Sequence, residues 1–345
     1  MEPTTSTSLA SQRAHTLVKN LQRVLVDSLT KVSQQLGDSS GFLPVEWLRE
    51  NGRHGGGVRF MAADEQLFNR ASVNVSQIHY DDLPEKALGS ATAISTIIHP
   101  KNPHAPSMHM HISWTEMKSG DGYWRVMADL NPSIPLNTAT QAFSDGLKKA
   151  APEQYAEGST QGDRYFTIPA LTRTRGVSHF YLENYSTSDA EADFELAQSI
   201  GKAVIQCYCQ LMASAVEQNP NPTIEDNQQQ LAYHTLYLFQ VLTLDRGTTS
   251  GLLVHNQNDI GILGSLPSHI DRELLASWKQ KLDSPQDQLL EAILAPLPTL
   301  SPCPITDEIK QALADGVRAH YQSHPQALDM QARGNVIPPT VKNHR

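Results

Sequence analysis

Four histidines fall within the thirteen residues from His99 to His111, and the segment then alternates in polarity. From residue 107 the odd positions are polar and the even positions apolar: Ser107, His109, His111, Ser113 and Thr115 against Met108, Met110, Ile112 and Trp114. Successive side chains of a β-strand point to opposite faces, so the pattern predicts a strand with imidazoles and hydroxyls along one face. Such a face can be a solvated sheet surface, a proton-transfer site or a metal site.

A carboxylate is expected on the same face. Residues 122–130 alternate in the same way, with apolar side chains at the even positions and Asp129 among the odd ones. Keeping the two apolar faces together requires opposing residue numbers to sum to an even value, and a three-residue turn around Gly120 predicts a sum near 240. This register places His111 opposite Asp129 and His109 one pair further along.

Two further features could contribute to a site on this face. A strand near 176–184 divides in the same way and places His179 with the polar residues. Just before it, Arg173 and Arg175 can clamp a carboxylate through paired N–H donors, although two exposed basic residues in a loop explain them equally well. Histidines and a carboxylate that share one face favour acid–base or metal chemistry over a solvated surface.

Hydrophobic periodicity predicts the elements that position these residues. Apolar residues recur every three or four positions from 14 to 36, which indicates an amphipathic helix. Strands joined by short turns, typical of an antiparallel meander, are predicted at about 58–62, 66–79, 90–98, 107–117 and 122–130. Further helices are predicted at about 137–150, 188–218, 224–238, 271–280, 286–294 and 305–322, with a hairpin turning at Asp245–Gly247. The predicted fold class is α+β, with one large antiparallel sheet flanked by helices.

Composition limits the class of protein and of partner. The chain has 345 residues and a net charge of −9, so no basic surface for nucleic acid is expected. No apolar run is long enough to span a membrane, no signal-peptide pattern opens the chain, and three cysteines form no disulfide framework. A cytoplasmic location is therefore expected. We expect a disordered leader at 1–8, a single domain at 9–304, and a C-terminal helical appendage with its tail at 305–345.

Several motifs are similar to those of the oxygen-dependent coproporphyrinogen III oxidases. The octapeptide HPKNPHAP at 99–106 matches that family without a change, and WLRENGRHGGG, ASVNVSQIH, TRGVSHFYLEN and LDRGTTSGL resemble its further motifs over about residues 40–300. The resemblance implies a large antiparallel sheet flanked by helices, a homodimer, and a site that needs neither metal nor organic cofactor. It also implies a reaction in which O2 converts two propionates of coproporphyrinogen to vinyl groups and releases CO2 and H2O2.

The resemblance also implies roles for individual residues. His109 and Asp129 match catalytic positions, and the family aspartate is thought to address the pyrrole N–H groups of the substrate. Arg175 would hold a propionate. The full set of expected substrate-binding residues is Ser95, His99, Ser113, Arg173, Arg175 and Arg246.

Some functional positions depart from the family. The family has an asparagine and an arginine where this chain has His111 and Ser113, and a glutamate where it has Arg173. Fewer cationic contacts should weaken the binding of a substrate that carries four propionates. This favours an O2-dependent oxidase, without organic cofactor, that oxidatively decarboxylates a smaller electron-rich carboxylate.

Three alternatives stay open. The chain can be a genuine coproporphyrinogen III oxidase of heme and porphyrin biosynthesis. It can be a metal-dependent oxidase that holds Cu, Fe or Zn through His109, His111 and His179, with Asp129 as a fourth ligand or as a support. It can also be a non-catalytic binder of a tetrapyrrole or another anion.

Overall fold

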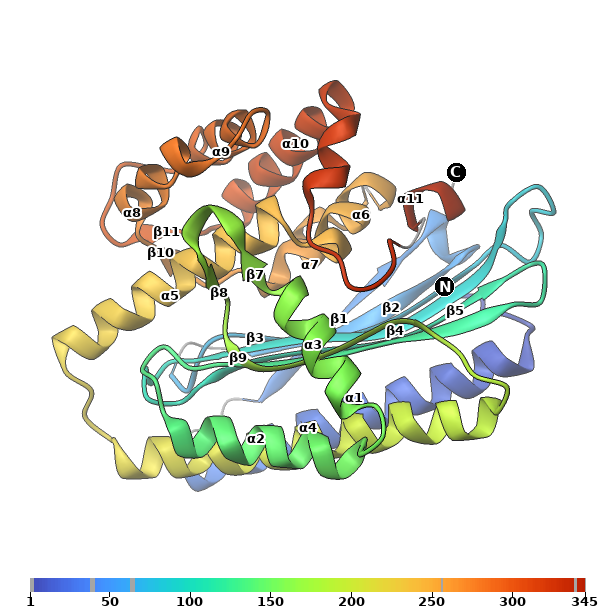
Figure 1. Ribbon diagram of the computed structural model, residues 1–345, viewed down its shortest axis with the longest axis horizontal. Helices are drawn as coiled ribbons and strands as arrows, with labels where there is room; N and C mark the ends of the chain where they lie inside the picture. Colours follow the sequence, from blue (N-terminus) through green and yellow to red (C-terminus); the bar gives the residue numbers. More distant parts are fainter. Residues whose placement is uncertain (1–2, 38–40, 63–65, 256, 338–339, 345) are drawn as a thin grey trace.

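A large antiparallel sheet forms the centre of the molecule. The computed structural model describes residues 3–37, 41–62, 66–255, 257–337 and 340–344. Among these residues the sheet has seven strands in the order β1-β2-β3-β4-β5-β6-β9, and each strand runs antiparallel to its neighbours (Figure 1). Helices lie on both faces of the sheet. The predicted α+β class and the single large sheet are confirmed.

The strands of the sheet include every strand of the predicted meander. They are β1 Phe42–Leu48, β2 Gly55–Ala62, β3 Phe68–His79, β4 Leu88–Pro100, β5 Ser107–Met117, β6 Gly122–Asn131 and β9 Val177–Tyr185. The periodicity misses β1, because this edge strand exposes Leu43 and Val45 and so lacks a buried face. Two short pairs lie outside the sheet: β7 Thr167–Ile168 with β8 Arg173–Thr174, and β10 His269–Ile270 with β11 Cys303–Pro304.

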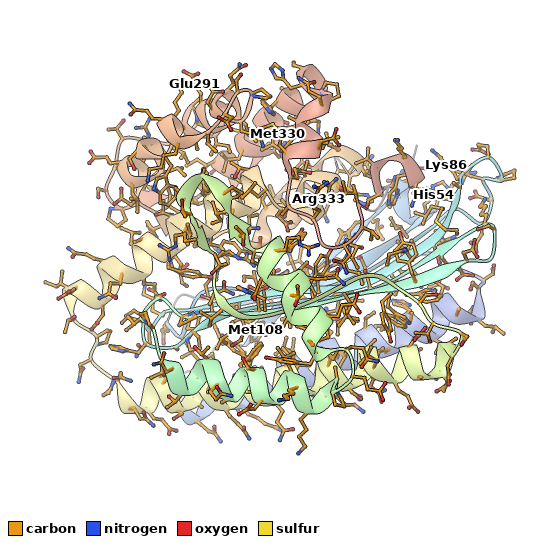
Figure 2. The ribbon with its side chains drawn as sticks, viewed as in Figure 1. His54, Lys86, Met108, Glu291, Met330 and Arg333 are labelled. Atoms are coloured by element: carbon orange, nitrogen blue, oxygen red, sulfur yellow. The ribbon has the colours of Figure 1, made fainter. Side chains whose placement is uncertain are left out.

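Three long helices cover the apolar face of the sheet. They are α1 Leu9–Gln35, α2 Asn137–Ala150 and α4 Ala190–Gln218 (Figure 1). Met108, Met110 and Ile112 of β5 are fully buried in the core against this layer, where Figure 2 labels Met108. Because the even-numbered side chains of β5 point to these helices, its odd-numbered polar side chains point to the other face.

A second helical layer lies over the polar face and has an apolar core of its own. It consists of α5 Ile224–Thr243, α6 Arg246–Val254, α7 Asp259–Ile262, α8 Arg272–Ser277, α9 Gln286–Leu294 and α10 Asp307–Ser323. The smaller helices α3 Tyr155–Tyr165 and α11 Thr340–Asn343 lie beside β9 and near α6. None of the described helices is long and apolar enough to cross a membrane.

The hairpin expected at Asp245–Gly247 is wrong, because helices occupy both sides of that position. α5 continues to Thr243, and α6 begins directly after Asp245, whose carboxylate accepts a hydrogen bond from the backbone N–H of Thr248. The β-branched residues of this segment favour a strand locally, but the N-cap and the burial of one helical face, including Leu252, decide for a helix.

The register of the β5–β6 hairpin differs from the expected one by one residue pair. His109, not His111, lies opposite Asp129, and paired residue numbers sum to 238 because the last pair is Glu116 with Gly122. The connection spans five residues and is closed by the Met117 N–H, which donates to the carbonyl of Asp121. The parity of the register, and with it the assignment of faces, agrees with the prediction.

Both terminal segments are more closely packed than expected. In place of a disordered leader, Thr4 hydrogen-bonds to the backbone of Gly52 and Ser6 is buried; residues 1–2 lie outside the described residues. In place of an appendage, α10 contributes Leu313 and Val317 to the second core. Residues 338–339 and 345 of the expected tail are not among those the structure describes.

Gly176 lies between Arg175 and the start of β9, and its backbone conformation allows a test of fold stability. Its φ is +72°, and an added Cβ would lie 2.3 Å from Asn131 Oδ1 and 2.7 Å from the carbonyl oxygen of Leu130. Gly120 has a φ of +93° but nothing within 4 Å of an added Cβ. Both Gly→Ala changes should cost about 1–3 kcal/mol of backbone strain. Gly176→Ala should lower the free energy of unfolding by a further ~1–3 kcal/mol through the clash. Urea denaturation of both variants measures the difference, and equal losses would contradict the clash.

Candidate active site

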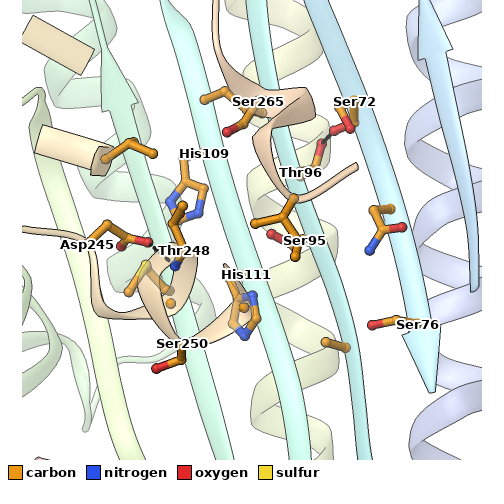
Figure 3. A pocket seen from close by; sticks show the side chains of 18 of the residues that line it. Ser72, Ser76, Ser95, Thr96, His109, His111, Asp245, Thr248, Ser250 and Ser265 are labelled. Atoms are coloured by element: carbon orange, nitrogen blue, oxygen red, sulfur yellow. Dashed lines mark hydrogen bonds between the residues drawn. The ribbon is translucent and has the colours of Figure 1, made fainter. Parts of the chain in front are cut away.

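A cavity of about 280 Å³ lies between the polar face of the sheet and the second helical layer. Strands β3 to β6 supply one wall, and α6 with the residues around it supplies the opposite wall. Figure 3 shows His109 and His111 among the side chains that line this cavity, together with Asp245 and Thr248. The imidazole face predicted from the alternation of β5 is therefore the wall of a cavity and is covered by helices.

His109 and Asp129 form a hydrogen-bonded pair at this wall. The His109 ring lines the cavity, whereas Asp129 is fully buried behind it, and His109 Nδ1 lies 2.8 Å from Asp129 Oδ1. Burial works against the charge of Asp129, but Arg175 and His109 outweigh it and lower the pKa of this carboxyl to about 2. An ionised carboxylate only accepts hydrogen bonds, so Nδ1 is the donor and Nε2 is the nitrogen left for substrate.

Arg175 neutralises the buried carboxylate. Its Nη2 donates to Asp129 Oδ2 at 2.8 Å, and Asn131 Nδ2 donates to the same oxygen at 2.6 Å. The rings of Phe166 and Tyr237 pack against the guanidinium, with centroids 4.5 and 5.0 Å from its central carbon. Arg175 reaches the cavity but is only 2% exposed. Its first role in this geometry is to hold Asp129 ionised.

His111 and Ser113 follow His109 along β5, on the same face of the sheet and next to β6. Ser113 Oγ lies 3.0 Å from His111 Nε2, and Ser113 is paired across the strands with Arg125. Burial first, and then the nearby Arg125, keep the pKa of His111 well below its usual value, so the imidazole is neutral. The guanidinium missing at position 113 is thus found one strand away, on the same wall of the cavity.

The remaining predicted binding residues divide into one that lines the cavity and three that do not. Ser95 of β4 lines it. His99 is fully buried, with its ring nitrogens 2.8 Å from Ser107 Oγ and 3.2 Å from the carbonyl oxygen of Ser265. Arg173 is exposed in β8. Arg246 donates to the backbone carbonyls of Leu328 and Ala332, so it anchors the C-terminal segment.

The three histidines expected to bind a metal do not converge. The pairs Ala128–Phe180 and Leu130–Val177 enclose a β-bulge at Ser178, whose φ is +53°. His179 then places Nδ1 2.8 Å from Asp163 Oδ1 and Nε2 2.8 Å from the backbone oxygen of Arg175. Within the described part of the chain, no group of three His, Cys, Asp or Glu residues is arranged to hold a metal ion. The structure therefore does not support the predicted His109–His111–His179 site.

Sequence reasoning missed several residues that line the cavity. Asp245 accepts a hydrogen bond from the Tyr165 hydroxyl at 2.8 Å and contributes a carboxylate to the wall. Thr340 and His344 reach the cavity from the C-terminal segment. The aspartate could have been found, because it belongs to the DRG motif quoted above. The C-terminal contacts join residues that are distant in sequence, such as Tyr80 and His344, and leave no local pattern.

Comparison with known proteins agrees with this site. The family model described as coproporphyrinogen III oxidase matches residues 13–297. An oxygen-dependent coproporphyrinogen-III oxidase of Prochlorococcus marinus is 27% identical over 322 residues, which cover 81% of this chain and 90% of that protein. The corresponding Rickettsia akari protein is 27% identical over 267 residues (73% and 94%), and the human mitochondrial protein is 27% identical over 319 residues (84% and 68%).

The match covers the sheet, both helical layers as far as α9, and the strands that carry the His109–Asp129 pair. It also accounts for the octapeptide at 99–106, which forms the end of β4 and the turn into β5. The chain belongs to the coproporphyrinogen III oxidase family and is an oxidoreductase of the oxygen-dependent class.

Proposed function

We propose that the chain is an oxygen-dependent coproporphyrinogen III oxidase, which converts propionate side chains of its substrate to vinyl groups. The observation that carries the proposal is the His109–Asp129 pair, which faces a cavity on the fold of this family. The names of the curated relatives support both the substrate and the use of O2. This proposal replaces the smaller carboxylate favoured by the motif departures.

The proposed reaction balances with O2 as the oxidant. For each propionate, R–CH2–CH2–COOH and O2 give R–CH=CH2, CO2 and H2O2. A C–H bond on the carbon next to the pyrrole breaks, the C–C bond to the carboxyl group breaks, and a C=C bond forms. Two electrons and two protons pass to O2, so no further oxidant is needed.

Three side chains are suited to the proton movements of this reaction. His109 presents Nε2 to the cavity, where it can accept a proton from the substrate or return one. Asp245 offers its carboxylate on the opposite wall as an acceptor for pyrrole N–H groups. Asp129 acts through His109, because it is fully buried behind the wall and its oxygens are occupied by His109, Asn131 and Arg175.

The proposed function is tested by measuring O2 uptake and CO2 release together. Coproporphyrinogen III, freshly reduced under anaerobic conditions, is mixed with the purified chain in air-saturated buffer. Spontaneous aromatisation consumes O2 but releases no CO2, so heat-inactivated protein gives the background. We expect one CO2 for each O2 consumed above that background, with a vinyl-bearing product after oxidation to the porphyrin. CO2 release at the background level would overturn the proposal.

A smaller carboxylate substrate is the second candidate, and one observation favours it. Among the described residues, the arginines that line the cavity are Arg125 and Arg175, and each is paired with a buried carboxylate. The cavity wall therefore carries little uncompensated positive charge for a tetra-anion. In the same assay, CO2 release from a monocarboxylate pyrrole but not from coproporphyrinogen III would select this candidate.

A homodimer and a cytoplasmic location complete the proposed function. The dimer is supported by the family resemblance, and the location by the composition of the chain, which has three cysteines. The rat and human relatives are named as mitochondrial proteins.

A further inference from the structure

Arg125 stands apart from the other charged groups of the cavity wall. Its side chain is 17% exposed, whereas that of Arg175 is 3% exposed. It projects from β6 on the polar face of the sheet, and the residue paired with it on β5 is the small Ser113. Because Ser113 is small, the longer Arg125 side chain has room to extend over β5.

Glu183 of β9 holds this arginine from behind the wall. Arg125 Nε donates to both carboxylate oxygens of Glu183, at 2.9 and 3.0 Å, and the Glu183 side chain is only 1% exposed. Among the described residues, none accepts a hydrogen bond from Nη1 or Nη2 of Arg125. Burial opposes the charge on Arg125, but Glu183 outweighs it and raises the pKa above its ordinary value. The guanidinium is thus charged and fixed in orientation, with its two Nη groups available.

The groups around Arg125 do not compete for those donors. Its neighbour His111 is a neutral imidazole bonded to Ser113, and Tyr165 is bonded to Asp245. Arg125 lines the cavity, and a guanidinium with two free Nη groups is matched by a planar carboxylate, which accepts both hydrogen bonds at once. The fixed Glu183 contact reduces the rotamer entropy that binding would otherwise cost.

We propose that Arg125 is the carboxylate-binding residue of this cavity, taking one propionate through Nη1 and Nη2 while Glu183 holds Nε. This assignment rests on the proposed function for the identity of the ligand. It makes Arg125 a specificity-determining residue and Glu183 its positioning residue. In this proposal Arg125 binds the substrate, whereas Arg175 stays paired with Asp129.

The decisive comparison is between Glu183→Gln and the double variant Arg125→Gln/Glu183→Gln. Both lack the ion pair and neither keeps a buried Glu183 carboxylate without its partner, so they differ only in the residue at position 125. The ligands are coproporphyrin III, which is oxidised and cannot react, and its tetramethyl ester, which has no carboxylate. Dissociation constants are measured by fluorescence titration.

For coproporphyrin III, we expect the double variant to bind on the order of 10- to 100-fold more weakly than Glu183→Gln, because a charge-assisted bidentate contact is lost. The tetramethyl ester should bind equally to both variants. Glu183→Gln should bind coproporphyrin III more tightly than the wild type, because its amide oxygen can still accept from Arg125 Nε while an opposing negative charge is removed. The dissociation constant of Arg125→Lys should lie between those of the wild type and the double variant, because lysine keeps the charge but lacks the paired Nη donors. Equal coproporphyrin III constants for the two Gln variants would overturn the assignment.

Turnover separates this proposal from the proposed function. If the wild type releases CO2 from coproporphyrinogen III and the double variant has an unchanged KM, the reaction stands and the Arg125 assignment fails. If the wild type releases no CO2 but the double variant loses coproporphyrin III binding, the assignment stands and the proposed reaction fails. Absence of coproporphyrin III binding to the wild type would overturn the Arg125 assignment, while CO2 release alone decides the reaction.

Discussion

Replacing Asp129 with asparagine is expected to lower turnover at least ~100-fold and the free energy of unfolding by about 3–5 kcal/mol. The stability loss has a single source: Arg175 stays fully buried while its counter-ion is removed. The loss of turnover has a different cause, which lies in the His109 tautomer. An asparagine amide can donate to Nδ1 of His109 where the carboxylate only accepts, which shifts the proton to Nε2 and removes the base from the cavity.

A double variant separates these two effects. Asp129→Asn/Arg175→Met removes the unpaired charge along with the ion pair, so it should recover most of the lost stability. It should recover none of the turnover, since the His109 tautomer is still unsupported. Urea unfolding and the CO2 assay measure the two quantities on the same samples. A double variant that regained turnover would show that Asp129 acts only through stability.

The same ion pair gives the wild type a defined acid dependence. The pKa of Asp129 is lowered from 3.8 to about 2, so the folded state binds this proton less readily than the unfolded chain. A depressed carboxyl pKa stabilises the fold above the unfolded pKa, and the contribution is lost as pH falls from about 4 toward 2. Asp129→Asn should lack this component, which is visible as a shallower loss of stability over that interval in acid-unfolding curves.

Replacing His109 with glutamine is expected to lower kcat by roughly 100- to 10,000-fold, the range of a general acid–base group. Glutamine can still donate to Asp129, so the buried carboxylate keeps a partner and the variant should fold. The dissociation constant of coproporphyrin III should change by less than about 3-fold, because neutral imidazole and amide groups contribute similarly to binding a carboxylate ligand. Steady-state kinetics and fluorescence titration give both values.

His111→Gln is the matched control for this change. His111 lies two residues along the same strand and also lines the cavity, but its hydrogen bond is to Ser113 and no carboxylate stabilises its cation. Its effect on kcat should stay within about 10-fold. If both variants lost activity equally, the distinction between an imidazole supported by a carboxylate and one without such support would be refuted.

Local patterns were sufficient for the faces of the sheet and for the family. Alternation in β5 and β6 assigned His109, His111 and Asp129 to one face, because a strand turns each successive side chain through half a turn. The motif at 99–106 indicated the family. Neither inference depends on anything beyond neighbouring residues, which explains why both agree with the structure.

Local patterns could not predict the register of the strands or the contacts made with elements distant in sequence. The predicted His111–Asp129 pairing assumed a three-residue turn, whereas the closing hydrogen bond of Met117 makes a longer one. Both ring nitrogens of His179 are occupied, by Asp163 and by the backbone oxygen of Arg175, and no alternation in the sequence marks these contacts. A one-residue change in a turn or a strand costs little locally, so packing of the whole sheet decides it.

The sequence by itself therefore determined the α+β class, the polar face that carries His109 and Asp129, and the family. Only the tertiary structure decided which residues share the cavity. It buried Asp129 behind His109, closed the wall with Asp245, and placed Arg125 opposite Ser113. The physical reason is that periodicity reports the direction of a side chain from its own strand. The partner it meets is set by the register and by the layer packed above, which depend on contacts distant in sequence.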